Sequence, residues 1–150
     1  MKRTNILMGF LMGTVMIQAQ PQHSRMMDEG GTGAYKAVMT DDASLPGFTI
    51  YRPADLQTTA KVEGPLPVVL FGNGGCRRTS YGYHNFLTDI ASHGYVILAV
   101  GPWNDGTIET EDVWKQDDDT HALKVADAKE LVNTALNWLS AENQRPGNDY

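Results

Sequence analysis

Two continuous apolar runs, residues 67–71 and 95–100, constrain the fold of this chain more than any other feature. Both runs contain β-branched residues and neither alternates with polar positions, which is typical of strands covered on both faces in a parallel sheet. Apolar residues recur at helical spacing over 83–91 between them, and Gly94 follows where a helix end favours a residue that tolerates positive φ. The chain is therefore predicted to contain a strand–helix–strand crossover unit, and its predicted fold class is α/β.

Weaker patterns predict the remaining elements. Residues 34–40 and 48–52 are predicted to be the strands of an antiparallel hairpin, with turn residues between them. Residues 20–33 show no hydrophobic periodicity and contain many residues that interrupt helices and strands, so a flexible leader is predicted there. The polar segment 54–66 is predicted to be a loop. A helix is predicted over 120–142, because six apolar residues follow one helical face: Ala128, Leu131, Val132, Ala135, Leu136 and Leu139.

The first 19 residues have the pattern of a secretory signal peptide. Lys2 and Arg3 precede an apolar run over 6–17, and Ala19 provides the small residue expected at a cleavage point. At about 1.5 Å per residue this run is too short to cross a hydrocarbon layer of about 30 Å, so no membrane anchor is predicted. We expect cleavage after Ala19 and export to a periplasm or to the medium. A disordered apolar terminus is the alternative.

The charge balance argues against one broad class of partner. The formal net charge is −6, and loss of Lys2 and Arg3 with the signal peptide would make it −8. An acidic surface repels phosphate backbones, and no cluster of basic residues offsets it, so no nucleic-acid partner is expected. Cys76 is the only cysteine, so no disulfide can form within these 150 residues.

A glycine-rich turn over 72–76 directly follows the first buried strand. Ligands bind at the carboxyl ends of strands in an open α/β sheet, and glycines let backbone N–H groups approach a phosphate or a developing oxyanion. A dinucleotide fingerprint that begins at Gly72 needs glycine where Arg77 stands, so nucleotide binding is a poor alternative. A tight turn without a ligand is the other alternative. No cofactor and no metal are predicted, since a solvated helix start explains Asp117, Asp118, Asp119 and His121.

The segments 67–76, 86–87 and 90–99 together form a recognisable pattern: Pro-Val-Val-Leu-Phe-Gly-Asn-Gly-Gly-Cys, then Phe-Leu, then Ile-Ala-Ser-His-Gly-Tyr-Val-Ile-Leu-Ala. It resembles secreted α/β-hydrolases related to the dienelactone-hydrolase and cutinase-like esterases. Residues 135–147 resemble the segment that precedes the nucleophile strand of that family. The resemblance implies that residues 34–150 are the N-terminal portion of an α/β-hydrolase domain, truncated before the nucleophile elbow.

The resemblance also implies roles for the glycine turn. The family's oxyanion turn falls on Asn73, Gly74 and Gly75, so the Gly75 backbone N–H is the candidate donor to a tetrahedral intermediate. Asn73, which stands where many members have histidine, is a candidate for shaping the loop together with Gly74 and Cys76. The serine nucleophile of the family, on a G-x-S-x-G elbow, and its acid and histidine all follow the helix at 120–142.

We therefore expect the 150-residue chain to have no turnover and the complete protein to hydrolyse a small or polymeric carboxylic ester through a serine. Two serines approximate the elbow pattern, but Ser80 has Arg78 and Ser92 has Ile90 where the first glycine belongs. Lipase, polyester hydrolase and peptidase follow esterase in order of preference. The alternative function is a non-catalytic exported binding domain for a sugar or a lipid.

Three further expectations concern the surroundings of the turn. Trp103, at the same sheet edge as Gly75, either lines an acyl or aromatic pocket or simply packs. The resemblance implies a disulfide partner for Cys76 beside the family's serine. Finally, buried parallel strands need neighbouring strands, and no strand is predicted after the helix at 120–142. A sheet with an unpaired strand edge is expected to self-associate through that edge.

Overall fold

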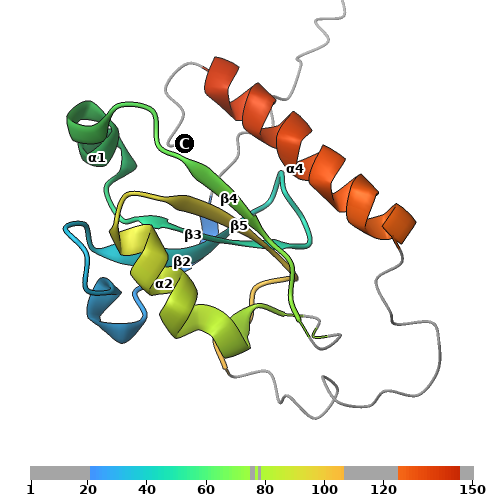
Figure 1. Cartoon of the computed structure of the whole chain (residues 1–150), viewed down its shortest axis with the longest axis horizontal. Helices are drawn as coiled ribbons and strands as arrows, with labels where there is room; N and C mark the ends of the chain where they lie inside the picture. The colour runs from blue at the N-terminus through green and yellow to red at the C-terminus, as the bar shows by residue number, and fades with distance from the viewer. Residues whose placement is uncertain (1–20, 75–76, 78, 107–124, 146–150) are drawn as a thin grey trace, which may run out of the picture.

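The computed structural model describes residues 21–74, 77, 79–106 and 125–145. Its centre is a five-stranded sheet with the strand order β1-β2-β3-β5-β4, so the α/β class is confirmed. Helix α2 covers one face of the sheet, and α1 and α4 pack on the opposite face (Figure 1). The elements in chain order are β1 (Pro21–Arg25), the 3₁₀ helix η1 (Asp28–Gly30), β2 (Ala37–Asp42), β3 (Phe48–Pro53), α1 (Leu56–Glu63), β4 (Val68–Phe71), the 3₁₀ helix η2 (Tyr81–Tyr83), α2 (His84–Ser92), β5 (Val96–Val100) and α4 (Val125–Gln144).

The predicted strand–helix–strand unit is present as β4, α2 and β5. The two strands pair in parallel, with Val68 beside Val96 and Phe71 beside Ala99. Gly94 lies between α2 and β5 with a φ of 88°, a value that few residues other than glycine adopt without strain. The predicted antiparallel hairpin is present as β2 and β3, and β3 pairs antiparallel with β5, so the sheet is mixed.

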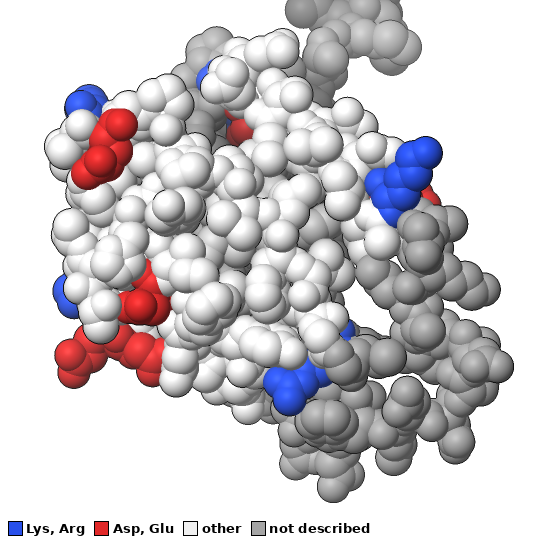
Figure 2. All heavy atoms as spheres, in the orientation of Figure 1, with Lys and Arg blue, Asp and Glu red and all other residues white. Residues whose placement is uncertain are grey.

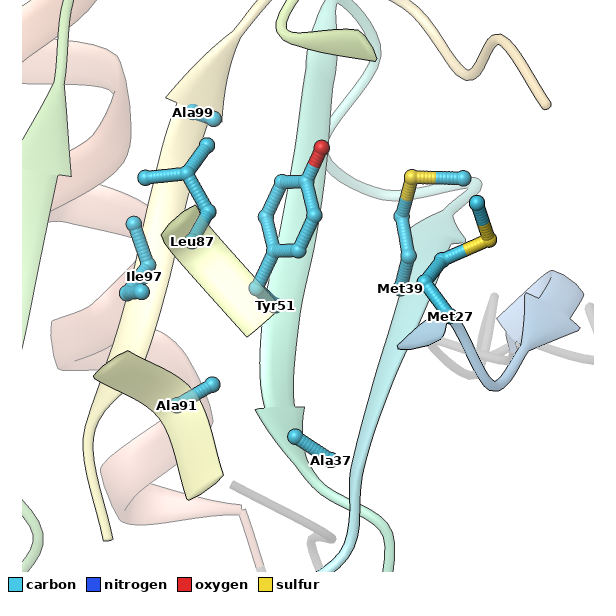
Figure 3. Packing of buried hydrophobic residues seen from close by; sticks show 8 residues of the cluster. All are labelled: Met27, Ala37, Met39, Tyr51, Leu87, Ala91, Ile97 and Ala99. Carbon is cyan, nitrogen blue, oxygen red and sulfur yellow. The ribbon is translucent and has the colours of Figure 1, made fainter. Parts of the chain in front are cut away.

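Alternate residues of β5 enter two separate cores. Ile97 and Ala99 face α2, whereas Val96 and Leu98 face α1 and α4. A strand that is buried on both faces needs apolar residues at every position, which explains its unbroken apolar sequence. Figure 3 shows the core on the α2 side, whose buried members are Met27, Ala37, Met39, Tyr51, Leu87, Ala91, Ile97 and Ala99.

The prediction that both apolar strands are covered on both faces is wrong for β4. This strand lies at one end of the sheet, and the side chains of Val68 and Leu70 remain 42% and 36% exposed on the α4 side. Val69 and Phe71, which point the other way, pack against the core under α2. Within the described residues β4 therefore has one paired edge and one free edge, because β5 is its sole strand neighbour there.

The prediction of a flexible leader over 20–33 is wrong for its first described residues. Pro21–Arg25 forms β1, which pairs antiparallel with β2. The Asp41 carboxylate accepts hydrogen bonds from the backbone N–H groups of Gln22 and His23, at 3.1 and 2.7 Å. This strand is polar and its partners in β2, such as Thr40 beside Ser24 and Met39 beside Arg25, are distant in the sequence, so local periodicity does not predict it.

The segment 54–66 contains the helix α1 rather than the predicted loop. Asp55 caps the helix, since its side chain accepts a hydrogen bond from the backbone N–H of Thr58 at 2.9 Å. The hydrogen bonds from Thr58 also lower the pKa of Asp55. Leu56 and Thr59 are the only buried residues of α1, so its sequence shows no extended apolar face.

Helix α4 confirms the helix predicted near the end of the chain, but the predicted apolar face is only partly buried, since Val132 and Leu136 are 44% and 50% exposed. Ala135 and Trp138 are buried against the sheet, and the helix ends at Gln144, slightly beyond the predicted end. The predicted start of this helix and the predicted signal peptide lie outside the described residues. In the ranges that the structure describes, no helix combines the length and the apolar character needed to cross a bilayer.

A buried hydrogen bond joins β3 to the residue before η2. Tyr51 is fully buried, and its Oη lies 3.0 Å from the Oγ of Ser80, which is also buried. Burial of the phenol raises the pKa of Tyr51 from 10.0 to about 12. The core under α2 therefore contains a phenol that stays neutral at a pH where an exposed tyrosine ionises.

We expect the free energy of unfolding to fall as the pH rises above 10, and Tyr51→Phe to remove much of this fall. The pKa of Tyr51 is higher in the folded chain than in the unfolded chain, so its stabilising effect is complete below pH 10 and is lost as the pH approaches 12. Two pKa units correspond to at most about 3 kcal/mol. Urea unfolding followed by circular dichroism between about pH 8 and pH 12 measures the effect. Tyr95→Phe, at a side chain that is 37% exposed, is the control, and an equally steep fall in the Tyr51→Phe variant would contradict the prediction.

Candidate active site

The carboxyl ends of β4 and β5 lie side by side, because the two strands are parallel neighbours. The glycine turn follows Phe71 at the end of β4, and the segment 101–106 follows Val100 at the end of β5. Ligands bind at this edge in open α/β sheets. The predicted donor Gly75 and its neighbour Cys76 lie outside the described residues, so the described part of the site is the stem of the turn.

Asn73 ties the glycine turn to the neighbouring strand. Its Nδ2 donates hydrogen bonds to the carbonyl oxygens of Val100, at 2.6 Å, and of Arg77, at 3.2 Å. The backbone N–H of Arg77 donates to the carbonyl oxygen of Gly74 at 3.4 Å. One side-chain amide thus spans the turn and anchors it to the end of β5.

Tyr83 supports the same turn from η2. Its hydroxyl donates to the carbonyl oxygen of Gly74 at 3.5 Å, and a Cβ added at Gly74 would lie 3.2 Å from that hydroxyl. The ring packs edge-on against Phe71, with centroids 5.2 Å apart, and the Arg77 guanidinium lies 5.1 Å from its centroid. The sequence identifies Tyr83 only as an apolar position of the helix predicted over 83–91. Its contact with the glycine turn is visible only in the tertiary structure.

The two serines that approximate an elbow pattern both make structural hydrogen bonds. Ser80 pairs with Tyr51 in the core. The Ser92 hydroxyl donates to the carbonyl oxygen of Asp89 at 2.6 Å and accepts from the backbone N–H of Gly33 at 2.8 Å. Both side chains are buried and neither follows a strand, so the geometry does not suit a nucleophile.

Among the described histidines, His84 has partners close to it in the chain and in η1. His84 stacks on Tyr81, with centroids 4.6 Å apart, and its Nδ1 lies 2.5 Å from the carbonyl oxygen of Tyr81. His84 Nε2 lies 3.7 Å from an Asp28 carboxylate oxygen. Among the residues that the structure describes, no group of three or more His, Cys, Asp or Glu residues is arranged to hold a metal ion.

Trp103 is half-buried beside the core under α2. Its ring stacks on His23, with centroids 5.3 Å apart and an interplanar angle of 19°. The Nδ1 of His23 lies 2.8 Å from an Asp41 carboxylate oxygen, so the first two strands hold the histidine against the indole. These contacts hold the indole in place after the carboxyl end of β5.

An apolar cavity of about 520 Å³ lies between α1, β4 and α4. Val68, at the start of β4, lines it together with Leu56, Leu66 and Leu139. The glycine turn follows the opposite end of β4. The cavity is therefore separate from the candidate active site.

The mixed sheet and its covering helices define an α/β protein whose strand order is consistent with part of an α/β-hydrolase fold. No family model matches the chain. Over 62 residues the chain is 37% identical to dipeptidyl aminopeptidase BIII of Pseudoxanthomonas mexicana, a match that covers 40% of this chain and 9% of the length of that protein. The chain is thus distantly similar to a hydrolase.

Proposed function

We propose that the glycine turn supplies the oxyanion hole of a serine-dependent hydrolase that acts on carboxylic esters. The observation that carries the proposal is the amide of Asn73, which links the turn to the end of β5. An oxyanion hole works only if its N–H donors are aligned before charge develops, and a link of this kind restrains the turn that would carry them. The distant similarity to a hydrolase supports a hydrolytic role.

In the proposed reaction a serine Oγ attacks the ester carbonyl carbon, and a histidine accepts the serine proton. The carbonyl oxygen gains the negative charge and accepts a hydrogen bond from the backbone N–H of Gly75. The C–O bond to the alcohol then breaks, the histidine protonates the departing alcohol, and water releases the acid from the acyl-serine. The pattern G-x-S-x-G does not occur in these 150 residues, so the proposed serine belongs to residues outside them.

A peptide amide is the second candidate substrate, because the matched relative is a dipeptidyl aminopeptidase. Hydrolysis of either bond passes through a tetrahedral oxyanion, so the same turn serves both reactions. Trp103 follows β5 at the same edge of the sheet and is our candidate wall for the acyl or aromatic group, with plain packing as the alternative. Export of the protein remains part of the proposal.

The test uses the full product of the open reading frame that encodes this chain. A fluorophosphonate probe, which reacts with activated serines, should label it at one serine, and p-nitrophenyl esters should be cleaved faster than dipeptidyl p-nitroanilides. Faster cleavage of the anilides would replace the ester proposal with the peptidase one. Absence of both labelling and hydrolysis would overturn the catalytic proposal and favour a binding domain.

A further inference from the structure

The first strand of the sheet contacts the segment that follows β5. The ring of His23, in β1, stacks on the indole of Trp103. The Arg25 Nη1 donates a hydrogen bond to the carbonyl oxygen of Asp105 at 3.1 Å and lies 3.9 Å from a carboxylate oxygen of the same residue. β1 lies at the end of the sheet opposite to β4. Two residues of β1 therefore hold two positions of the segment 101–106.

Asp41 fixes the histidine in this arrangement. Its Oδ2 lies 2.8 Å from the His23 Nδ1, and its Oδ1 accepts hydrogen bonds from the backbone N–H groups of Gln22 and His23. The Asp41 side chain is 14% exposed. A carboxylate can only accept, so Nδ1 is the donor, and its hydrogen bond restricts rotation of the imidazole ring. The ring is thus fixed before it stacks on the indole.

The ends of the segment 101–106 are held by other elements. The carbonyl oxygen of Gly101 accepts a hydrogen bond from the hydroxyl of Thr49, in β3, at 3.0 Å. At the other end Gly106 has a φ of 89°, and a Cβ added there would collide with the Tyr81 hydroxyl. The contacts with β1 hold the residues between these two ends.

The 3₁₀ helix η2 joins this segment to the glycine turn. Tyr81 packs against Gly106, and Tyr83, two residues further along, donates to the carbonyl oxygen of Gly74 at 3.5 Å. Tyr81, Tyr83 and Trp103 also pack against the core under α2. Trp103 is therefore connected to the glycine turn through a continuous set of contacts.

We propose that His23 is a positioning residue of the candidate active site and that, by fixing Trp103, it determines selectivity for large acyl groups. The inference rests on the proposed ester hydrolysis, because it concerns the substrate of that same site. A side chain that must be ordered when the substrate binds weakens binding. An indole that His23 already holds in one orientation favours a substrate whose acyl group reaches it.

A large uncharged acyl group fits the chemistry of this part of the molecule. An indole offers an apolar surface and a single N–H donor. Figure 2 shows that charged side chains lie mostly around the rim of the face that carries β4 and α4, and its middle is almost uncharged. We therefore expect a benzoyl ester to be preferred over an acetyl ester, whose methyl group is too small to contact the indole.

Steady-state kinetics of the full product of the open reading frame tests the selectivity. The readout is the ratio of kcat/KM for p-nitrophenyl benzoate to that for p-nitrophenyl acetate. His23→Ala should lower this ratio about 3- to 10-fold through a higher KM for the benzoate, the scale of ordering one side chain on binding. His23→Phe, which keeps a flat ring that can stack, should recover most of the ratio. Gln22→Ala is the matched control and should keep the parent ratio, because Gln22 bonds to Asp41 through its backbone N–H.

A double-mutant cycle shows whether His23 acts through the indole. Trp103→Ala should lower the ratio at least as much as His23→Ala does. In the Trp103→Ala background, His23→Ala should have no further effect. If the protein hydrolyses esters but either single variant keeps the parent ratio, or the two effects add in the double variant, the inference is overturned and the proposed function stands.

Tryptophan fluorescence provides a readout that does not depend on catalysis. The emission of Trp103 is the difference between the parent protein and Trp103→Phe, and in His23→Ala it should become more accessible to acrylamide quenching. His23→Gln can still donate to Asp41 but has no ring to stack, so it replaces His23→Ala if circular dichroism shows that the alanine variant is unfolded. Unchanged quenching in a folded variant would overturn the positioning role. A product that hydrolyses neither ester would instead overturn the proposed function and, with it, the selectivity role.

Discussion

Replacing Asn73 by alanine is expected to lower the kcat of the full open-reading-frame product about 10²-fold, the scale of a small misplacement of a catalytic donor. The substitution removes the hydrogen bonds to Val100 and Arg77, so the turn is no longer anchored to β5. The Gly75 N–H would then be poorly aligned with the oxyanion. KM should change little, because the lost interaction matters mainly in the transition state.

Two further variants at this position separate donation from shape. Asn73→Asp has nearly the same shape as asparagine but cannot donate to the two carbonyl oxygens, so its loss should match or exceed that of alanine. Asn73→His supplies an N–H, and histidine stands at this position in many members of the family that the chain resembles. This variant should therefore recover part of the rate. Steady-state kinetics with a p-nitrophenyl ester measures all three. An unchanged kcat in the alanine variant, or a change confined to KM, would contradict the positioning role.

Replacing Leu87 by alanine is expected to lower the free energy of unfolding by about 2–5 kcal/mol. Leu87 is 1% exposed and attaches α2 to the core, where it packs among residues from β2, β3 and β5 (Figure 3). Its truncation removes buried apolar area and leaves a cavity in a helix-to-sheet contact. Since α2 follows η2 and Tyr83, the same change should loosen the support of the glycine turn.

The neighbouring residue of the same helix provides the control. Phe86 is 59% exposed, so Phe86→Ala should change the free energy of unfolding by no more than about 0.5 kcal/mol. Urea unfolding at one fixed protein concentration is the measurement, because association through β4 would make stability depend on concentration. A smaller loss at position 87 than at position 86 would show that α2 is not held as the structure describes.

Local sequence patterns were sufficient to predict the elements with strong periodicity. Continuous apolar runs predicted β4 and β5 as strands, and the i, i+3, i+4 spacing predicted α4, because each of these patterns is complete within one short segment of the chain. The position of the glycine turn after a buried strand also predicted where the candidate site lies. The resemblance to the α/β-hydrolases identified Asn73 as a site residue, although its partner in β5 was not predicted.

Contacts between distant residues were decided only by the tertiary structure. β1 is polar and is held by β2 through Asp41, and α1 depends on the Asp55 cap and a single apolar anchor, so neither leaves a periodic pattern. The same holds for Tyr83 against the turn and for the link from Asn73 to Val100. Whether an apolar strand is central or at an edge depends on which strands pair with it, and this distinguishes the exposed β4 from the buried β5. Hydrophobic pattern is local, whereas strand order and hydrogen-bond partners are properties of the whole packed sheet.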